Sequence, residues 1–173
     1  GTNGKTTTTS LLGEIMKCWK ESVYVVGNIG NPYTQAAPKM TEESVTVAEI
    51  SSFQLETIDQ FHPKVSAILN ITPDHLNRHH TMANYIAAKE SIVKNQTRDD
   101  LCVLNYNDEV LRAFGKTLEQ KVVLFSSTET LDAGLYLQEN EILWARNGKT
   151  EHIISVEELN ILGAVSYTHL RAH

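Results

Sequence analysis

The sequence predicts an α/β protein with a doubly wound, mostly parallel sheet and a small antiparallel meander appended to it. Strand and helix patterns alternate through the first 125 residues, as in βαβ units. A glycine-rich turn leads directly into the first helix. Three short strand patterns separated by turn signals follow near the end. With 173 residues and 41% hydrophobic content, the chain has the size and the apolar material for one domain core.

The first element is a glycine-rich turn, Gly-Thr-Asn-Gly-Lys-Thr at residues 1–6, which has the form of a phosphate-binding P-loop. Backbone N–H groups in such a turn cradle phosphate oxygens, the lysine reaches the β- and γ-phosphates, and the hydroxyl reaches Mg²⁺. The turn is shorter than the general motif, so a plain surface turn before an ordinary helix is the alternative. The predicted nucleotide-binding residues are Gly1, Thr2, Asn3, Gly4, Lys5, Thr6 and Thr7.

A helix is predicted next, over Thr6–Lys20, since apolar residues recur along one of its faces. Three strands are predicted after it: Val23–Val26, Ser44–Ile50 and Val65–Leu69. The third is nearly all apolar, which favours a strand covered on both faces. A P-loop is launched by a strand, and none precedes Gly1, so we expect the natural start to be missing.

The second half continues with a helix at Met82–Gln96, a strand at Leu101–Leu104, a helix at Asp108–Gly115 and a strand at Val122–Phe125. After Ser126 come three short strand patterns: Leu135–Gln138, Glu141–Arg146 and Glu151–Ile154. They are separated by Glu139-Asn140 and by Asn147-Gly148-Lys149, and Asn-Gly is a strong hairpin signal. These segments form the predicted meander.

The charge balance argues against two classes of partner. The formal net charge is −6 and no block of Lys or Arg is present, so neither a nucleic acid nor an anionic membrane is expected. Cys18 and Cys102 are far apart and form neither a metal motif nor a disulfide framework, which favours a reducing cytosol. We therefore expect a cytoplasmic protein, and a monomer.

Polar residues follow two of the predicted strands, where ligands bind in α/β sheets. Glu49 lies near the end of one strand, where an acid can hold Mg²⁺ directly or through water, although a solvated carboxylate is the alternative. The segment Asn70–His75 follows the next strand, and Asp74 and His75 are expected at the same sheet edge as Glu49. Asp74 could equally cap a turn after Pro73.

His79 and His80 lie close to His75 in sequence, which raises zinc as a second possibility. The absence of a nearby cysteine and the oxygen-rich setting favour Mg²⁺. Lys89 lies in the predicted helix 82–96, and by composition alone it is an ordinary solvated lysine.

Taken together, the motifs resemble the Mur ligase family, which makes bacterial cell-wall peptide. The resemblance runs from Gly1 to Gly163 and includes its most telling segment, Glu-Ile-Ser-Ser-Phe-Gln-Leu-Glu at 49–56, which is similar to the D-glutamate-adding members. The other matching segments are 1–6, Gly-Asn-Ile-Gly at 27–30, Asn-Ile-Thr-Pro-Asp-His-Leu at 70–76 and Tyr-Ile-Ala-Ala-Lys at 85–89.

The resemblance implies ATP, two Mg²⁺ ions and a role for each matching residue. Lys5, His75 and Lys89 would be catalytic, and Lys89 would be carbamylated, since a carbamate supplies oxygen ligands that suit Mg²⁺. The implied metal-binding residues are Thr6 and Glu49 for the first ion and His75 and Lys89 for the second. The implied substrate-binding residues are Asn28, Ser51, Gln54 and His75.

The implied reaction is ATP-dependent amide formation. A carboxylate of UDP-N-acetylmuramoyl-L-alanine would attack the γ-phosphate to give an acyl phosphate, and the amine of D-glutamate would then displace phosphate. Charge builds on the transferring phosphoryl group and on the tetrahedral intermediate, where Lys5 and the metal ions would stabilise it.

The chain departs from the family pattern in two places. Asn77 stands where an Asp is usual, which weakens a contact beyond the metal ligands. The family's Gly-x-His-Asn motif is not continued after Gly163, so we expect residues 1–163 to be the central ATP-binding domain, truncated at its start, and 164–173 to be an artefactual tail. We also expect this polypeptide alone to bind Mg-nucleotide without ligating.

Other functions remain open. A sister ligase that adds a different amino acid, or a folylpolyglutamate synthase, is the near alternative, and the segment 49–56 argues against both. A non-catalytic nucleotide-binding module is the alternative from another class, and it would bind Mg-nucleotide without needing Lys89. A purely structural domain leaves the joint presence of Lys5, Glu49, His75 and Lys89 unexplained.

Overall fold

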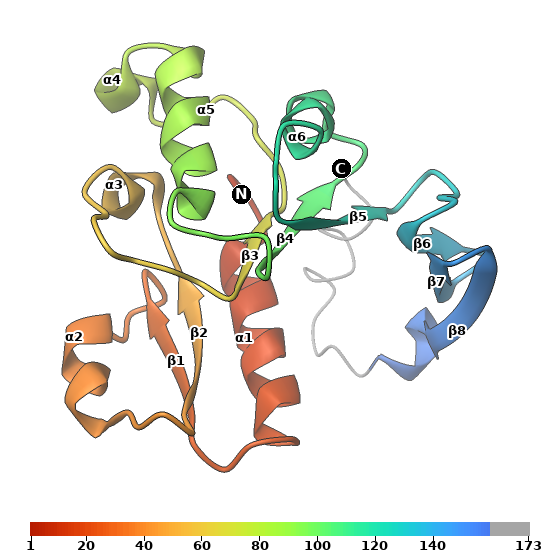
Figure 1. Ribbon diagram of the computed structural model, residues 1–173, viewed down its shortest axis with the longest axis horizontal. Coiled ribbons are helices and arrows are strands. Elements are labelled where there is room, and N and C mark those ends of the chain that lie inside the picture. Colours follow the sequence, from red (N-terminus) through yellow and green to blue (C-terminus); the bar gives the residue numbers. More distant parts are fainter. Residues whose placement is uncertain (160–173) are drawn as a thin grey trace. The chain divides into compact units, whose positions relative to one another are not determined.

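The computed structural model describes residues 1–159 (Figure 1), so the tail expected at 164–173 lies outside the described residues. The described chain divides into two compact units, one formed by Asn3–Asp59 and the other by Gly1–Thr2 with residues 60–159. Among the described helices, none has both the length and the apolar character needed to cross a membrane.

The Asn3–Asp59 unit is built on two parallel strands, β1 (Val23–Gly27) and β2 (Val45–Glu49). Helix α1 (Lys5–Lys17) packs against both strands, and two short helices, α2 (Tyr33–Ala36) and α3 (Ser52–Leu55), follow β1 and β2. A 3₁₀ turn at Ala37–Lys39 extends α2. The register pairs Gly27 with Glu49, so both strands end at the same level.

Helix α1 approaches the strands through small residues and not through its apolar stripe. Thr9 and Gly13 are its buried residues, and a Cβ added at Gly13 would lie 2.4 Å from a methyl group of Val25. Most of the apolar residues that suggested an amphipathic helix are exposed in contrast, with Leu12 at 43% and Ile15 at 55%, while Met16 is half-buried. Periodicity therefore predicted the helix, although it ends at Lys17 and not at Lys20, and close backbone packing decided which face it buries.

The larger unit contains a six-stranded sheet in the order β3-β4-β5-β6-β7-β8. Its strands are β3 (Val65–Ile68), β4 (Leu101–Asn105), β5 (Lys121–Ser126), β6 (Gly134–Gln138), β7 (Glu141–Arg146) and β8 (Lys149–Ser155). Pairing is parallel from β3 to β6 and antiparallel from β6 to β8. The predicted α/β class, mostly parallel with an antiparallel meander, is confirmed, although β1 and β2 form a separate sheet.

Helices α4 (Leu76–His79), α5 (Met82–Glu90) and α6 (Glu109–Gly115) belong to this unit. The predicted helix 82–96 is shorter than expected, because α5 ends at Glu90 and gives way to a 3₁₀ turn at Ser91–Val93. A further 3₁₀ turn, Val156–Glu158, follows β8. The core of the unit gathers side chains from β3, the segment after it, β4, α5 and α6: Ile68, Ile71, Tyr85, Cys102, Leu104 and Leu111.

Strand β3 differs from the expectation of burial on both faces. Its side chains alternate, with Ser66 and Ile68 buried while Val65 is 59% exposed. Successive side chains of a strand point to opposite faces, and only one face of β3 meets the core. The hairpin signal at Asn147-Gly148 is confirmed, since both residues have positive φ, 54° and 70°, as the two-residue turn between β7 and β8 requires.

Candidate functional site

The phosphate-binding turn runs into the start of α1. Gly4 precedes the helix with a φ of 76°, a left-handed conformation that glycine adopts without strain. Glycine also brings no capping side chain, and a helix start of this kind is a favourable place for phosphate oxygens. Lys5, Thr6 and Thr7 form the first turn of α1, with Thr6 and Thr7 exposed.

Glu49, the last residue of β2, is the centre of a polar cluster in the Asn3–Asp59 unit. Its side chain is buried, with only 3% exposed. The Thr6 hydroxyl donates to Oε2 of Glu49 at 2.7 Å, and the Asn28 amide donates to Oε1 at 2.9 Å. The structure therefore brings together three of the residues that the sequence singled out, from α1, the end of β2 and the turn after β1.

The Thr6 and Glu49 oxygens fit a divalent metal ion. Neighbouring ligands of an octahedral Mg²⁺ at about 2.1 Å are about 3.0 Å apart, and Thr6 Oγ1 lies 2.7 Å from Glu49 Oε2. Both donors are oxygens, which a hard cation prefers. Within residues 1–159, no three His, Cys, Asp or Glu side chains are arranged to hold a metal ion, so such a site would rely on this hydroxyl, one carboxylate and ligands from outside the chain.

Ser51 and Gln54, both predicted to contact substrate, bond to each other at the start of α3. Ser51 Oγ accepts from the Gln54 N–H at 3.3 Å, and Gln54 Oε1 accepts from the Ser51 N–H at 2.8 Å. This reciprocal capping box fixes the short helix that follows Glu49. Their contact with substrate stays a prediction.

In the larger unit, Lys89 is not exposed to solvent as a lysine in a helix usually is. The side chain is only 5% exposed, and Nζ donates to the Gly1 carbonyl oxygen at 3.2 Å. Nζ also lies 4.6 Å from the centre of the Tyr85 ring, one helical turn earlier on α5.

Tyr85 belongs to a matched motif, yet sequence reasoning assigned it no role. Its hydroxyl lies 3.0 Å from Thr2 Oγ1, which in turn donates to the Thr72 carbonyl at 3.1 Å. The Thr2 N–H donates to the Asn70 carbonyl at 3.0 Å. The start of the phosphate-binding turn is therefore fixed to α5 and to the segment after β3. The four-residue spacing from Lys89, which places both side chains on one helix face, was the available signal.

The three histidines are placed differently from one another. His75 precedes α4 with a φ of 52°, and its Nε2 lies 3.4 Å from Asp74 Oδ2. His79 is buried and packs its ring 5.2 Å from that of Tyr85, whereas His80 is exposed. Asp74 also accepts a hydrogen bond from the N–H of its neighbour His75 at 2.9 Å, while α4 has no side-chain cap, so a capping role for Asp74 stays a prediction.

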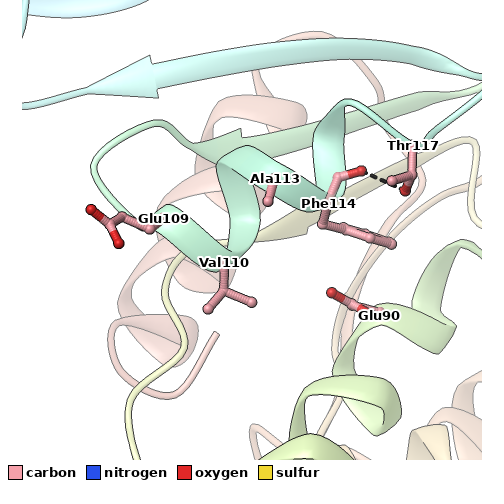
Figure 2. A pocket seen from close by; sticks show the side chains of 6 residues that line it. All are labelled: Glu90, Glu109, Val110, Ala113, Phe114 and Thr117. Atoms are coloured by element: carbon pink, nitrogen blue, oxygen red, sulfur yellow. Dashed lines mark hydrogen bonds between the residues drawn. The ribbon is translucent and has the colours of Figure 1, made fainter.

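A shallow pocket of about 630 Å³ lies between α5 and α6 of the larger unit (Figure 2). It is lined by Glu90, Glu109, Val110, Ala113, Phe114 and Thr117. Burial raises the pKa of Glu90, whose carboxyl group lies near the Phe114 ring in Figure 2. None of the predicted site residues lines this pocket, so the candidate site is defined by the polar clusters and not by a cavity.

Comparison with known proteins decides the family. A model described as "Mur ligase middle domain" matches residues 1–165. The chain belongs to the Mur ligase family. It is similar to the UDP-N-acetylmuramoylalanine–D-glutamate ligases of Lachnoclostridium phytofermentans, with 55% identity over 172 residues, and of Clostridioides difficile, with 59% over 143. These matches cover 99% and 83% of the chain, but only 38% and 32% of the two ligases.

Solved structures support the Mur ligase fold. One is a UDP-N-acetylmuramoyl-L-alanyl-D-glutamate–2,6-diaminopimelate ligase, with a TM-score of 0.62 and 22% identity, covering 99% of this chain and 40% of that one. Another is the MurF ligase of Thermotoga maritima in complex with ADP, with a TM-score of 0.60 and 20% identity, covering 100% and 44%. At such identities the likeness concerns the fold alone.

Proposed function

We propose that this chain is the ATP-binding part of a ligase that adds D-glutamate to UDP-N-acetylmuramoyl-L-alanine in the cytoplasm. The observation that carries the proposal is the Thr6–Glu49 pair at the end of a P-loop, in a chain 55% identical to a ligase named for that reaction. The chain spans less than two fifths of such relatives, so residues outside it would complete the substrate sites.

The proposed phosphate site uses the start of α1. Lys5 would pair with the β- and γ-phosphates of ATP, and backbone N–H groups at the start of α1 would donate hydrogen bonds to the phosphate oxygens. Thr6 and Glu49 would hold the first Mg²⁺, which neutralises charge on those phosphates. The role of Lys5 is to stabilise the negative charge of the phosphoryl group during transfer.

His75 and Lys89 would hold the second Mg²⁺ in this proposal. Carbamylation would turn the buried Lys89 from a cation into an oxygen ligand. Asn28, Ser51, Gln54 and His75 would contact the UDP-sugar substrate, whose carboxylate attacks ATP to give an acyl phosphate. The amine of D-glutamate would then attack the acyl carbon, forming the amide bond and displacing phosphate.

Nucleotide binding by the chain itself tests the proposal. We expect the purified chain to bind Mg-ATP in calorimetry and Lys5→Ala to weaken binding by about 10-fold or more, since a charge-assisted contact with phosphate contributes about 1.5–3 kcal/mol. Lys94→Ala, a lysine on the turn after α5, is the control and should bind like the original chain. Equal binding by all three proteins would refute the phosphate site.

The non-catalytic alternative is separated from the ligase by Lys89. A simple nucleotide-binding module would not need this residue. If the intact protein that contains the chain is a ligase, we expect Lys89→Ala to abolish its D-glutamate-dependent phosphate release while Mg-ATP still binds.

A further inference from the structure

The turn after β1, residues 27–31, is built around Glu49. The Asn28 N–H donates to the Glu49 carbonyl at 2.8 Å, and the Gly27 N–H donates to the Asn31 carbonyl at 2.7 Å. Gly27 has a φ of 94°, and a Cβ there would lie 2.2 Å from the Glu49 carbonyl oxygen. The backbone of Asn28 is thus fixed against the residue to which its side chain also bonds.

The direction of the hydrogen bond between the Asn28 and Glu49 side chains is fixed by their chemistry. A carboxylate only accepts, so the amide group that faces Oε1 of Glu49 at 2.9 Å must be the NH₂ of Asn28. The Thr6 hydroxyl occupies the other oxygen, Oε2. With one donor on each oxygen, the carboxylate group is held against rotation about its terminal bond, and each oxygen keeps a further lone pair.

We propose that Asn28 is a positioning residue that orients Glu49 for the metal ion. This inference rests on the proposed function, in which Glu49 is a magnesium ligand, and it is distinct from the predicted contact between Asn28 and substrate. Asn28 is exposed while Glu49 is buried, and the Asn28 NH₂ group bonds to the buried carboxylate.

The physical reason is preorganisation. A glutamate side chain has three rotatable bonds, and an ion that binds to it must first select one arrangement. Partners that fix a ligand in place are typically worth 10–100-fold in metal affinity. Loss of the Asn28 amide should therefore weaken metal binding without removing any metal ligand.

The test uses Mn²⁺ as the probe with ADP as the nucleotide, and the free Mn²⁺ is measured by electron paramagnetic resonance. We expect Asn28→Ala to raise the Mn²⁺ dissociation constant by about 10–100-fold in the presence of ADP. ADP affinity measured without metal should not change. Asn28→Ser is the second variant, since its side chain is one bond shorter and cannot replace the amide, and thermal melting confirms that each variant is folded.

Two further variants make the result decisive. Asn31→Ala removes an amide from the same turn, one that donates to the Val25 carbonyl and not to Glu49, and should bind Mn²⁺ like the original chain. Glu49→Gln removes the proposed ligand itself. If Glu49→Gln loses Mn²⁺ while Asn28→Ala and Asn28→Ser match Asn31→Ala, the inference is wrong and the proposed function stands. If the original chain and Glu49→Gln bind Mn²⁺ equally, the metal role of Glu49 fails and the inference falls with it.

Discussion

At the scale of single residues, the hydrogen bonds around Thr2 show how the start of the phosphate-binding turn is held. Thr2 Oγ1 donates to the Thr72 carbonyl and accepts from the Thr72 N–H at 3.0 Å. A hydroxyl has one proton to donate, so the Tyr85 hydroxyl must donate the remaining bond to Thr2. Burial raises the pKa of Tyr85, which keeps the phenol protonated and able to donate at neutral pH.

Removing that phenol hydroxyl should therefore destabilise the protein. We expect Tyr85→Phe to lower the free energy of unfolding by about 1–2 kcal/mol, because it removes a buried hydrogen bond and leaves Thr2 with an unfilled acceptor site. Urea unfolding measures the change. Tyr24→Phe is the matched control, since the Tyr24 hydroxyl donates to the Lys39 carbonyl at an exposed position. A loss for Tyr85→Phe no larger than that for Tyr24→Phe would contradict this account.

At the scale of elements, the turn after β1 depends on the close approach of two backbones. Gly27 and Gly30 both have positive φ, 94° and 103°, but they differ in their surroundings. A Cβ at Gly27 would meet the Glu49 carbonyl oxygen, while a Cβ at Gly30 has no heavy atom within 4 Å. Alanine substitutions at Gly27 and Gly30 can therefore separate the cost of a positive φ from the cost of a steric clash.

We expect Gly30→Ala to cost about 1–2 kcal/mol, the price of placing a Cβ in the left-handed region. Gly27→Ala should cost clearly more, about 3 kcal/mol or above, because β1 must also move away from the end of β2. Thermal and urea unfolding of the two variants measure both costs. Similar losses of unfolding free energy for the two variants would show that the backbone moves at little cost to relieve the clash with the Glu49 carbonyl, and would contradict this account.

At the scale of the whole molecule, a buried carboxylate ties together the starts of three strands. Asp100 is fully buried and accepts hydrogen bonds from His62 Nε2 at 2.6 Å, Lys64 Nζ at 3.1 Å and the Thr97 N–H at 2.6 Å. The Lys121 N–H, at the start of β5, donates to its backbone carbonyl at 3.2 Å. These donors, the His62 contact foremost, hold the pKa of Asp100 well below its ordinary value of 3.8.

Stability should therefore fall in acid. A carboxyl group whose pKa is depressed by folding contributes its full stabilisation above its unfolded pKa, and that contribution is lost as the pH falls toward the folded value. We expect the melting temperature to drop as the pH decreases below about 4, and Asp100→Asn to be less stable at neutral pH with a shallower drop in acid. Asp99→Asn, at the exposed neighbouring position, should follow the original chain. Parallel acid curves for the Asp100→Asn variant and the original chain would contradict this role.

The sequence by itself determined the α/β class, the order of the elements, the hairpin at Asn147-Gly148 and the position of Glu49 at a strand end. These features depend on periodicity and turn preference, which act between close neighbours in the chain. Only the tertiary structure decided that Lys89 is buried, that most of the apolar stripe of α1 is exposed and that the Asn28 amide bonds to Glu49. Such facts depend on contacts between distant residues, such as Lys89 with Gly1, 88 positions apart, and no local pattern encodes which surfaces meet.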